Sequence, residues 1–196
     1  MAPKARNAKS DTTDGHVRGK DFLTDEEMAR LPEASKGGRH GIRDHLLVLM
    51  IYRHGLRVTE AATLRIDALN LKEARLWVKR SKGSQDGAQP ITGDELRAIK
   101  RYLAIRKSNL PWLFVSERGQ PLTRQGIAYI IREAGERARL GHVWPHMLRH
   151  SCGYHLANLS QVPDLRLIQD YLGHKNIKNT ARYTRTSARR FEGLWD

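Results

Sequence analysis

The chain has 196 residues, enough for one domain with a sizeable core, and its 35 Lys and Arg residues outnumber its 21 Asp and Glu residues. Such an excess favours a polyanionic partner, and nucleic acid is the commonest polyanion. No apolar run reaches the roughly 18 residues of a transmembrane helix, so no membrane partner is expected. Residues 1–20 lack the apolar centre of a secretory signal, and the single cysteine, Cys152, excludes an intrachain disulfide, so we expect a cytoplasmic protein.

The spacing of apolar residues predicts a mainly α fold with a small antiparallel β-sheet (α+β). Residues 1–20 are basic and polar with almost nothing to bury, so we expect a disordered N-terminal arm. The alternation in Arg75–Lys79 predicts a strand, which the turn-rich segment 81–87 connects to a second strand at 88–91. Capping residues, periodicity and terminal glycines predict helices over about residues 24–31, 42–54, 59–64, 94–107, 123–138, 145–159, 164–172 and 177–182.

A nucleic-acid partner makes phosphodiester chemistry the first reaction to consider. Cleavage by a protein nucleophile needs cations around the non-bridging oxygens, a proton acceptor, a proton donor for the leaving oxygen, and in-line attack. Tyr183 is a candidate nucleophile, although a phenol, with a pKa of about 10, is inert without cations and a proton acceptor beside it. A tyrosine taken alone is usually structural, so this assignment depends on the residues around it.

The segment that starts at Pro145 supplies part of those surroundings. Helical spacing puts His146, Arg149 and His150 on one face. His146 lies in the first turn, where the helix dipole disfavours the charged imidazole, so a neutral ring can accept a proton there. The planar guanidinium of Arg149 suits a phosphate. The alternative is a basic surface helix with ordinary histidines.

Three further residues can complete such a site. Arg57 falls in a short loop between two predicted helices, from which its side chain can reach outward. Lys82 lies in the hairpin turn, where a flexible lysine can donate a proton to a leaving oxygen. His174 follows Gly173 at the end of a predicted helix and can supply another donor to the phosphate. Arg57 and Lys82 also have a simpler interpretation as exposed surface residues.

Other chemistries fit the sequence less well. His142, His146 and His150 recur at intervals of four, like metal ligands. Pro145, however, separates His142 from the helix, and no acidic residue accompanies them as in His-Glu-x-x-His. No acidic cluster suits a two-metal nuclease, and the segment 81–87 is not a Walker loop. We therefore expect chemistry with no metal and no other cofactor.

The ordered set of residues resembles the tyrosine recombinase (phage integrase) family. Its parts are Arg57 within Gly-Leu-Arg-Val-Thr-Glu, Lys82 in the hairpin, His146-x-x-Arg149-His150, Leu-Gly-His174 and a tyrosine nine positions later. The match spans roughly residues 21–196. The segments Trp-Pro-His-Met-Leu-Arg-His and Ile-Gln-Asp-Tyr-Leu-Gly-His are most similar to the short fimbrial phase-variation recombinases, DNA invertases that invert a promoter segment and so switch surface-structure genes.

This resemblance implies a recombinase catalytic domain over residues 21–185 and a role for each site residue. Arg57 and Arg149 would bind the scissile phosphate, and His146 would be the acid/base group. Lys82, preferred to Lys79 because it stands in the turn before Gly83, would protonate the leaving 5′-oxygen. The other members would be His174, which stabilises the transition state, Tyr183, which forms a 3′-phosphotyrosine, and the supporting residues Glu60 and His150. That covalent link conserves bond energy, so no ATP is implied.

The resemblance also implies partners. They are double-stranded DNA with inverted-repeat recognition sites, a homotetramer assembled on that DNA, and accessory DNA-bending proteins, all at the nucleoid. Many family members close a clamp on DNA with a separate N-terminal domain, whereas a shorter segment precedes the core here. How the duplex is encircled, and whether neighbouring protomers or other proteins assist, therefore stays open on the sequence alone. The tail, residues 186–196, packs either on a neighbouring protomer or on its own domain.

Two other functions stay open on the sequence alone. Residues 123–140, with polar residues at a helix start, would suit a non-catalytic transcription regulator that reads a major groove. A type IB topoisomerase-like relaxase would share the chemistry but lack site specificity. The arginine, histidine and tyrosine set favours an enzyme over the regulator, and a required recognition sequence would separate the recombinase from the relaxase.

Overall fold

A computed structural model describes residues 20–81, 84–159 and 164–184. The basic arm to residue 19, Lys82 and the tail 186–196 therefore lie outside the described residues, and the three-part division of the chain stays a prediction. In the described segments, no helix is both long and apolar enough to span a membrane.

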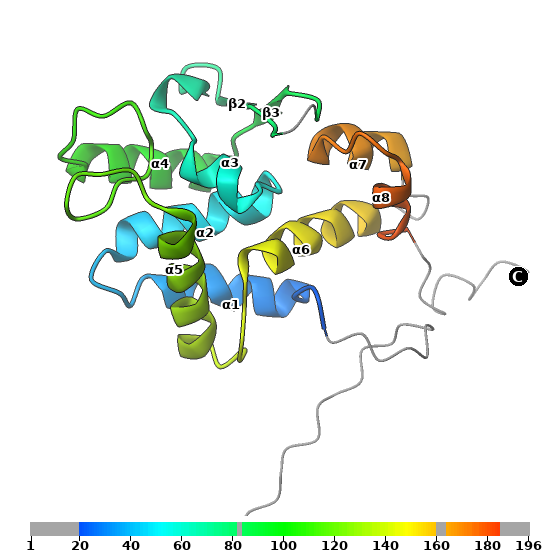
Figure 1. The fold of residues 1–196 in the computed structure, drawn as a ribbon, viewed down its shortest axis with the longest axis horizontal. Coiled ribbons are helices and arrows are strands. Elements are labelled where there is room, and N and C mark those ends of the chain that lie inside the picture. Colours follow the sequence, from blue (N-terminus) through cyan, green and yellow to red (C-terminus); the bar gives the residue numbers. More distant parts are fainter. Residues whose placement is uncertain (1–19, 82–83, 160–163, 185–196) are drawn as a thin grey trace, which may run out of the picture.

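The expected fold class, mainly α with a small antiparallel sheet, is confirmed (Figure 1). Helix α2 lies at the centre, and α1, α4 and α6 pack against it. A helix that is apolar on nearly every face is buried all round, so α2 fixes the helices that surround it. In chain order the described elements are α1 (Asp25–Ser35), α2 (Gly41–Arg53), α3 (Val58–Ala62), a 3-10 helix (Ile66–Ala68), β1 (Leu69–Asn70), β2 (Arg75–Val78), β3 (Gly87–Pro90), α4 (Gly93–Ile105), α5 (Arg124–Arg137), α6 (Pro145–Asn158), α7 (Leu165–Leu172) and α8 (Lys178–Ala181).

Helix α1 begins at the predicted capping box but runs further than predicted. Thr24 Oγ1 accepts the Glu27 N–H at 3.3 Å, and Glu27 Oε2 accepts the Thr24 N–H at 2.9 Å. The predicted end near Leu31 was wrong, because Pro32 lies within the helix, which continues to Ser35. Pro32 and Ser35 are both buried, so tertiary packing outweighs the local cost of the proline.

The sheet has one strand more than the predicted hairpin, in the order β1-β2-β3. On β2, Leu76 pairs with Leu69 of β1 and with Gln89 of β3. A strand of two residues, such as β1, is too short for alternation to reveal. The alternation predicted for β2 is present: Leu76 and Val78 are buried, whereas Trp77 is 52% exposed. The next inward position beyond the strand is therefore residue 80.

Helices α7 and α8 lie at one end of α6 (Figure 1). Asp164 Oδ1 caps α7 by accepting two backbone N–H groups, and Gly173, with a φ of 65°, ends it in the left-handed conformation. Here Cys152, Ile168, Leu172 and Tyr183 form an apolar cluster separate from the main core. Cys152 is buried, as predicted, and Tyr183 belongs to the packing between α6 and α7.

Two glycines of α5 give a matched test of how closely this helix packs against the segment at residues 141–143. A Cβ at Gly135 would lie 2.7 Å from Val143 Cγ2 and 3.0 Å from the Gly141 carbonyl oxygen, so Gly135→Ala should lower the free energy of unfolding by about 1–3 kcal/mol. A Cβ at Gly126 would meet Thr123 Oγ1 at 3.4 Å and Leu122 Cδ2 at 3.9 Å, which are ordinary contacts, so Gly126→Ala should be neutral or stabilising by up to about 1 kcal/mol. Urea unfolding of both variants decides, and equal stabilities would contradict the close α5 contact.

Candidate active site

Arg57 lies between α2 and α3, as predicted, and is itself the N-cap of α3. The predicted start of this helix at Thr59 was wrong: the Glu60 side chain accepts the Arg57 N–H at 2.9 Å, so Arg57 is the cap and the helix begins one residue earlier, at Val58. Glu60 Oε1 also accepts Arg57 Nη1 at 2.6 Å. The Arg57 side chain is 29% exposed, so its guanidinium is both anchored and accessible.

Arg80 also binds Glu60, and the sequence reasoning missed it. Its side chain is 1% exposed, and its Nη1 donates to Glu60 Oε2 at 2.9 Å. Burial alone would raise the pKa of Glu60, but the Arg57 N–H, the Arg80 charge and the Ser81 N–H lower that pKa to about 2. The ionised carboxylate therefore compensates a buried guanidinium. The alternation of β2 carried the signal, because residue 80 continues the inward positions 76 and 78.

Arg149 is buried on α6 and anchored by backbone carbonyls. Its Nη1 donates to the Gly55 oxygen, and its Nη2 donates to the Leu172 oxygen at 2.8 Å. Arg80 reaches the same segment, because its Nη1 and Nη2 lie 3.1 Å and 2.9 Å from the Gly55 and His54 oxygens. Burial and the neighbouring charges of Arg57 and Arg80 lower the pKa of Arg149 to about 10, so it stays cationic at neutral pH.

The three arginines and Glu60 form one connected charge cluster. Arg57 and Arg80 share the Glu60 carboxylate, and Arg80 and Arg149 share the Gly55 carbonyl. Three guanidinium groups and one carboxylate leave a net charge of +2. Like charges gathered in a buried place are costly without an anion between them, so this cluster favours an anionic ligand.

Tyr183 lies against the histidines of α6. Its Oη is 2.8 Å from His150 Nδ1, and the side chain is 4% exposed. Burial raises the pKa of Tyr183 to about 12, although Arg149 and Arg182 act in the opposite direction. A phenol and a neutral imidazole at this distance share a hydrogen bond in which Nδ1 can accept the phenolic proton. His150 is thus the described residue that stands ready to take it.

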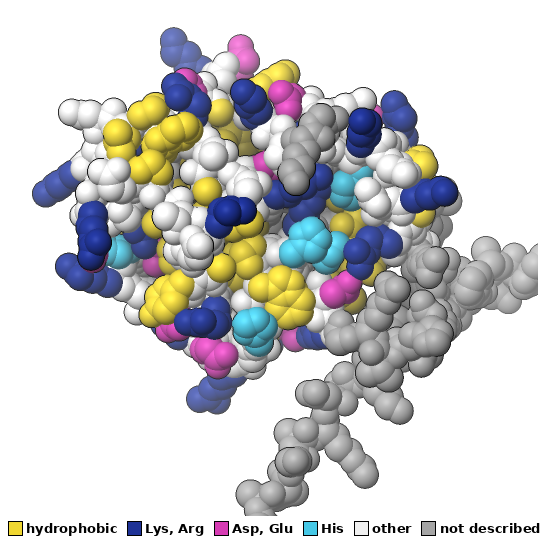
Figure 2. Space-filling view, in the orientation of Figure 1, with side chains coloured by type: hydrophobic (Ala, Val, Ile, Leu, Met, Phe, Trp, Pro, Cys, Tyr) yellow, Lys and Arg dark blue, Asp and Glu magenta, His cyan; other side chains and the backbone are white. Residues whose placement is uncertain are grey.

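His150, His146 and His174 lie at or beside this hydrogen bond. Figure 2 shows histidine side chains (cyan) next to Lys and Arg side chains (dark blue) on one face of the molecule. Burial lowers the pKa of His150 to about 3 and of His174 to about 4, and Arg149 contributes to both shifts. The pKa of His146 is lowered by partial burial and then by Arg149, which adds to the helix-dipole effect expected from the sequence. The His146 and His150 rings meet at 4.2 Å between centroids, and His174 Nδ1 is 2.9 Å from Thr180 Oγ1.

A glycine on α6 makes room for the tyrosine ring. A Cβ at Gly153 would lie 2.6 Å from Tyr183 Cζ, so any larger residue would push the ring away. The ring also lies 5.2 Å from Tyr154 and, nearly parallel, 6.1 Å from His174. Position 153 thus sets where the phenol sits relative to His150.

The structure brings most of the predicted site residues together. Arg57, Glu60, His146, Arg149, His150, His174 and Tyr183 lie at the junction of α2, α3, α6 and α7. Lys82 lies outside the described residues, so its role stays a prediction. Lys79, the alternative, is exposed at the end of β2. No group of three or more histidine, cysteine, aspartate or glutamate side chains within the described segments could hold a metal ion.

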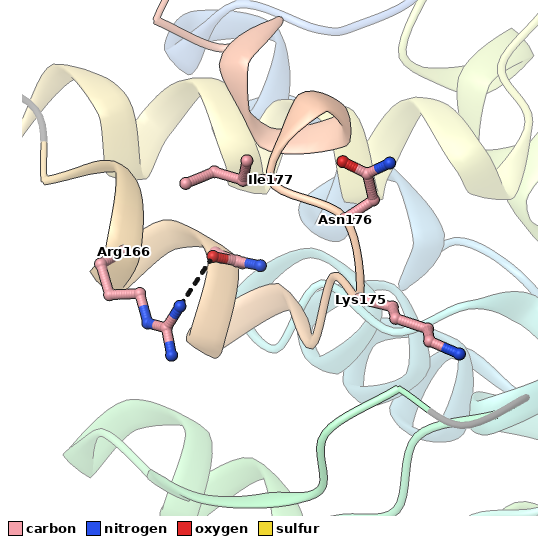
Figure 3. A pocket seen from close by; sticks show the side chains of 5 residues that line it. Arg166, Lys175, Asn176 and Ile177 are labelled. Atoms are coloured by element: carbon pink, nitrogen blue, oxygen red, sulfur yellow. Dashed lines mark hydrogen bonds between the residues drawn. The ribbon is translucent and has the colours of Figure 1, made fainter.

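A groove next to this cluster has a different character. Arg166, Lys175, Asn176 and Ile177 line it, together with Gln169, between α7 and the loop that leads to α8 (Figure 3). Arg166 Nη1 is 3.4 Å from Gln169 Oε1, and Ile177 is 46% exposed. Two basic residues make the groove suitable for an anionic surface, but it holds neither Tyr183 nor the arginine cluster.

Known proteins share both the sequence and this fold. Residues 21–190 match the model of the phage integrase family. The type 1 fimbriae regulatory proteins FimB and FimE of Escherichia coli are 42% and 41% identical to this chain, over 90% and 89% of it and 90% of each relative. The tyrosine recombinase XerA of Pyrococcus furiosus is 38% identical over 85% of this chain and 58% of the relative.

Solved structures give the same assignment of fold. The crystal structure of XerA recombinase superposes with a TM-score of 0.75 and 28% identity, over 89% of this chain and 63% of that one. The XerH site-specific recombinase in a pre-cleavage complex with its difH substrate gives 0.74 and 25%, over 90% of this chain and 55% of that one. The chain therefore spans less than two thirds of either protein.

The neutral histidines predict how stability depends on pH. The pKa of His174 is about 4 in the folded chain and about 6.5 in the unfolded chain. Between about pH 6.5 and pH 4, His174 is therefore protonated in the unfolded chain but neutral in the folded chain. The free energy of unfolding should therefore fall as pH drops from about 6.5 towards 4, by about 1.4 kcal/mol per pH unit for each such proton. Urea unfolding across this range should show a shallower slope in His174→Gln. The exposed His142→Gln is the control, and equal slopes in His174→Gln and wild type would contradict the prediction.

Proposed function

This chain belongs to the phage integrase family of tyrosine recombinases, and we propose that it cuts and rejoins DNA at specific sites with Tyr183 as its nucleophile. One observation carries the proposal: the Tyr183 phenol is 2.8 Å from a neutral imidazole and stands beside a cluster of three arginines. A phenol needs both a proton acceptor and nearby cations to attack a phosphodiester.

The proposed reaction exchanges one phosphodiester for another. Tyr183 Oη bonds to phosphorus, the bond from phosphorus to the 5′-oxygen breaks, and a 3′-phosphotyrosine and a free 5′-hydroxyl result. A 5′-hydroxyl of the partner strand then attacks the phosphotyrosine and releases the phenol. Each step makes one phosphorus–oxygen bond and breaks one, so no external energy source is required.

The arginine cluster matches the charge that develops during this exchange. A phosphodiester carries one negative charge, and the five-coordinate transition state carries about two on its non-bridging oxygens. Arg57 and Arg149 are proposed to bind these oxygens. Glu60 and Arg80 are proposed to hold these two arginines in place. His174, fixed by Thr180, donates a further hydrogen bond to the same phosphate.

The protons move through the histidines. His150 Nδ1 is proposed to accept the Tyr183 proton, because it is the imidazole nitrogen that contacts Oη. His146, whose ring meets His150 edge-on, is the acid/base group that exchanges this proton with the reacting oxygens. Lys82 is proposed to protonate the leaving 5′-oxygen, as the family resemblance implies.

The biological substrate proposed here is a promoter segment flanked by inverted repeats, whose inversion switches fimbrial or other surface-structure genes. Similarity to FimB and FimE over 90% of their length supports this choice over the other recombinases. A homotetramer on DNA, assisted by DNA-bending proteins at the nucleoid, would bring two such repeats together. A net charge of +14 suits phosphate contacts and a steep dependence of binding on salt.

A nicked suicide substrate tests the nucleophile. Wild-type protein should become covalently attached to DNA that carries its recognition site, because loss of the short 5′-fragment prevents religation. Tyr183→Phe should give no adduct yet keep DNA binding, since only the attacking oxygen is removed. Tyr154→Phe, which alters the neighbouring ring, should still form the adduct. Tight binding by the wild type without any adduct would show a non-catalytic DNA-binding regulator instead.

An inversion assay tests the substrate. The DNA that flanks the gene should contain a promoter segment between inverted repeats, and on a plasmid the wild-type protein should convert one orientation into the other, as read by PCR across each junction. Tyr183→Phe should leave the segment fixed. Relaxation of any supercoiled plasmid, with no need for the repeats, would point to a topoisomerase-like relaxase.

A further inference from the structure

His54 is fully buried and directly precedes Gly55, whose carbonyl binds the arginine cluster. The proposed reaction does not use this histidine. The His54 side chain has no exposed surface, and neither of its ring nitrogens contacts solvent. Its Nδ1 is 2.8 Å from Gln89 Oε1, and its Nε2 is 2.7 Å from Glu95 Oε1. These partners come from β3 and α4, so His54 joins the end of α2 to both elements.

The surrounding hydrogen bonds fix the protons of this group. Gln89 Nε2 donates to the Tyr171 carbonyl at 2.7 Å, so the amide must present its oxygen to His54 Nδ1, which therefore carries a hydrogen. The other ring nitrogen faces a carboxylate oxygen, and one proton lies between the two. Together, His54 and Glu95 thus hold a buried proton in an ion pair or its neutral equivalent.

Glu95 has a polar atom that the fold leaves without a hydrogen bond. Among the described residues, its Oε2 is a buried side-chain oxygen with no such partner, and the nearest cation, Arg53 Nη1, is 3.7 Å away. A buried ion pair of this kind is poor evidence for stability, because an apolar replacement is often as stable. A role in fixing the backbone conformation explains better why the fold keeps this costly buried pair.

The backbone beside His54 is what the arginines bind. The His54 carbonyl accepts Arg80 Nη2, the Gly55 carbonyl accepts both Arg80 and Arg149, and Arg57 follows two residues later. Arg80 Nη2 also donates to the Tyr171 carbonyl, the same oxygen that orients Gln89. The hydrogen bonds of the His54 ring and those of the arginines therefore hold the same backbone segment, residues 54–55.

We propose that the His54–Glu95 pair is a positioning site for DNA cleavage, which sets the direction of the carbonyls at residues 54 and 55 and thereby the guanidiniums of Arg80 and Arg149. The pair touches no substrate atom and acts only through these arginines. The inference rests on the proposed function, since it concerns the rate of the same cleavage step.

The double variant His54→Leu/Glu95→Leu separates positioning from stability. Two apolar side chains of similar volume remove the directional hydrogen bonds without leaving a charge unpaired, although the buried Gln89 Oε1 loses its donor, so the melting temperature should fall by only a few degrees. Single-turnover cleavage of a saturating suicide substrate should nevertheless slow by about 10-fold or more, because misplaced groups cost rate even when the fold is intact. The dissociation constant for DNA should stay unchanged.

A substrate with a neutral methylphosphonate at the scissile position reveals whether the arginines carry the effect. Replacing one non-bridging oxygen by methyl removes the charge that the guanidiniums stabilise. The ratio of wild-type to double-variant rates should therefore be smaller on this substrate than on the phosphodiester. An equal ratio on both substrates would overturn the proposal, as would a double variant that cleaves within about twofold of wild type.

Two further variants keep the comparison sharp. Should the double variant not fold, Glu95→Gln retains a hydrogen bond to His54 but not its charge, and cleavage should slow by about threefold or more, again less on the methylphosphonate. An unchanged Glu95→Gln rate would then overturn the proposal. Asp94→Asn removes the adjacent, 54% exposed carboxylate of α4 and should cleave normally. A wild-type protein that forms no covalent adduct with DNA would instead contradict the proposed function itself.

Discussion

The carbonyl of Gly55 is the contact on which the site depends. It accepts hydrogen bonds from Arg80 and Arg149, which come from the end of β2 and from α6. Glycine is required at this position, because its φ is 54° and a Cβ would lie 2.4 Å from Leu172 Cδ2. The left-handed turn that ends α2 thus also forms the floor of the arginine cluster.

Charge compensation determines how this cluster can exist before DNA arrives. Arg80 and Arg149 are both nearly inaccessible, and each would be costly to bury alone. Glu60 neutralises one unit of charge, and the carbonyls at 54, 55, 171 and 172 solvate the rest with partial negative charge. The excess that remains suits an anionic ligand such as the proposed phosphate, and the folded protein holds these cations in place before any ligand binds.

The sequence predicted most helices well and singled out residues that the structure brings together, because each left a local signal. The capping box at Thr24, the left-handed Gly173 and the spacing from His146 to His150 are all visible within a few residues. Arg80 and the His54–Glu95 pair were missed because their partners lie 20 to 91 residues away in the chain. Only the alternation of β2 hinted that residue 80 points inward, and nothing local shows that His54 meets Glu95.

The state of Tyr183 bears on when cleavage can begin. Its phenol is 4% exposed, its pKa is raised to about 12, and it is hydrogen-bonded to His150, so the unbound protein holds this proposed nucleophile protonated and buried. The phenol packs in the apolar cluster of Cys152, Ile168 and Leu172, so its attack on a phosphate requires a more accessible phenol. Leu172 belongs to that cluster, and its carbonyl binds Arg149, so movement of the tyrosine and placement of the phosphate act on the same end of α7. Exposure of the proposed nucleophile and the anchoring of Arg149 are in this way physically linked.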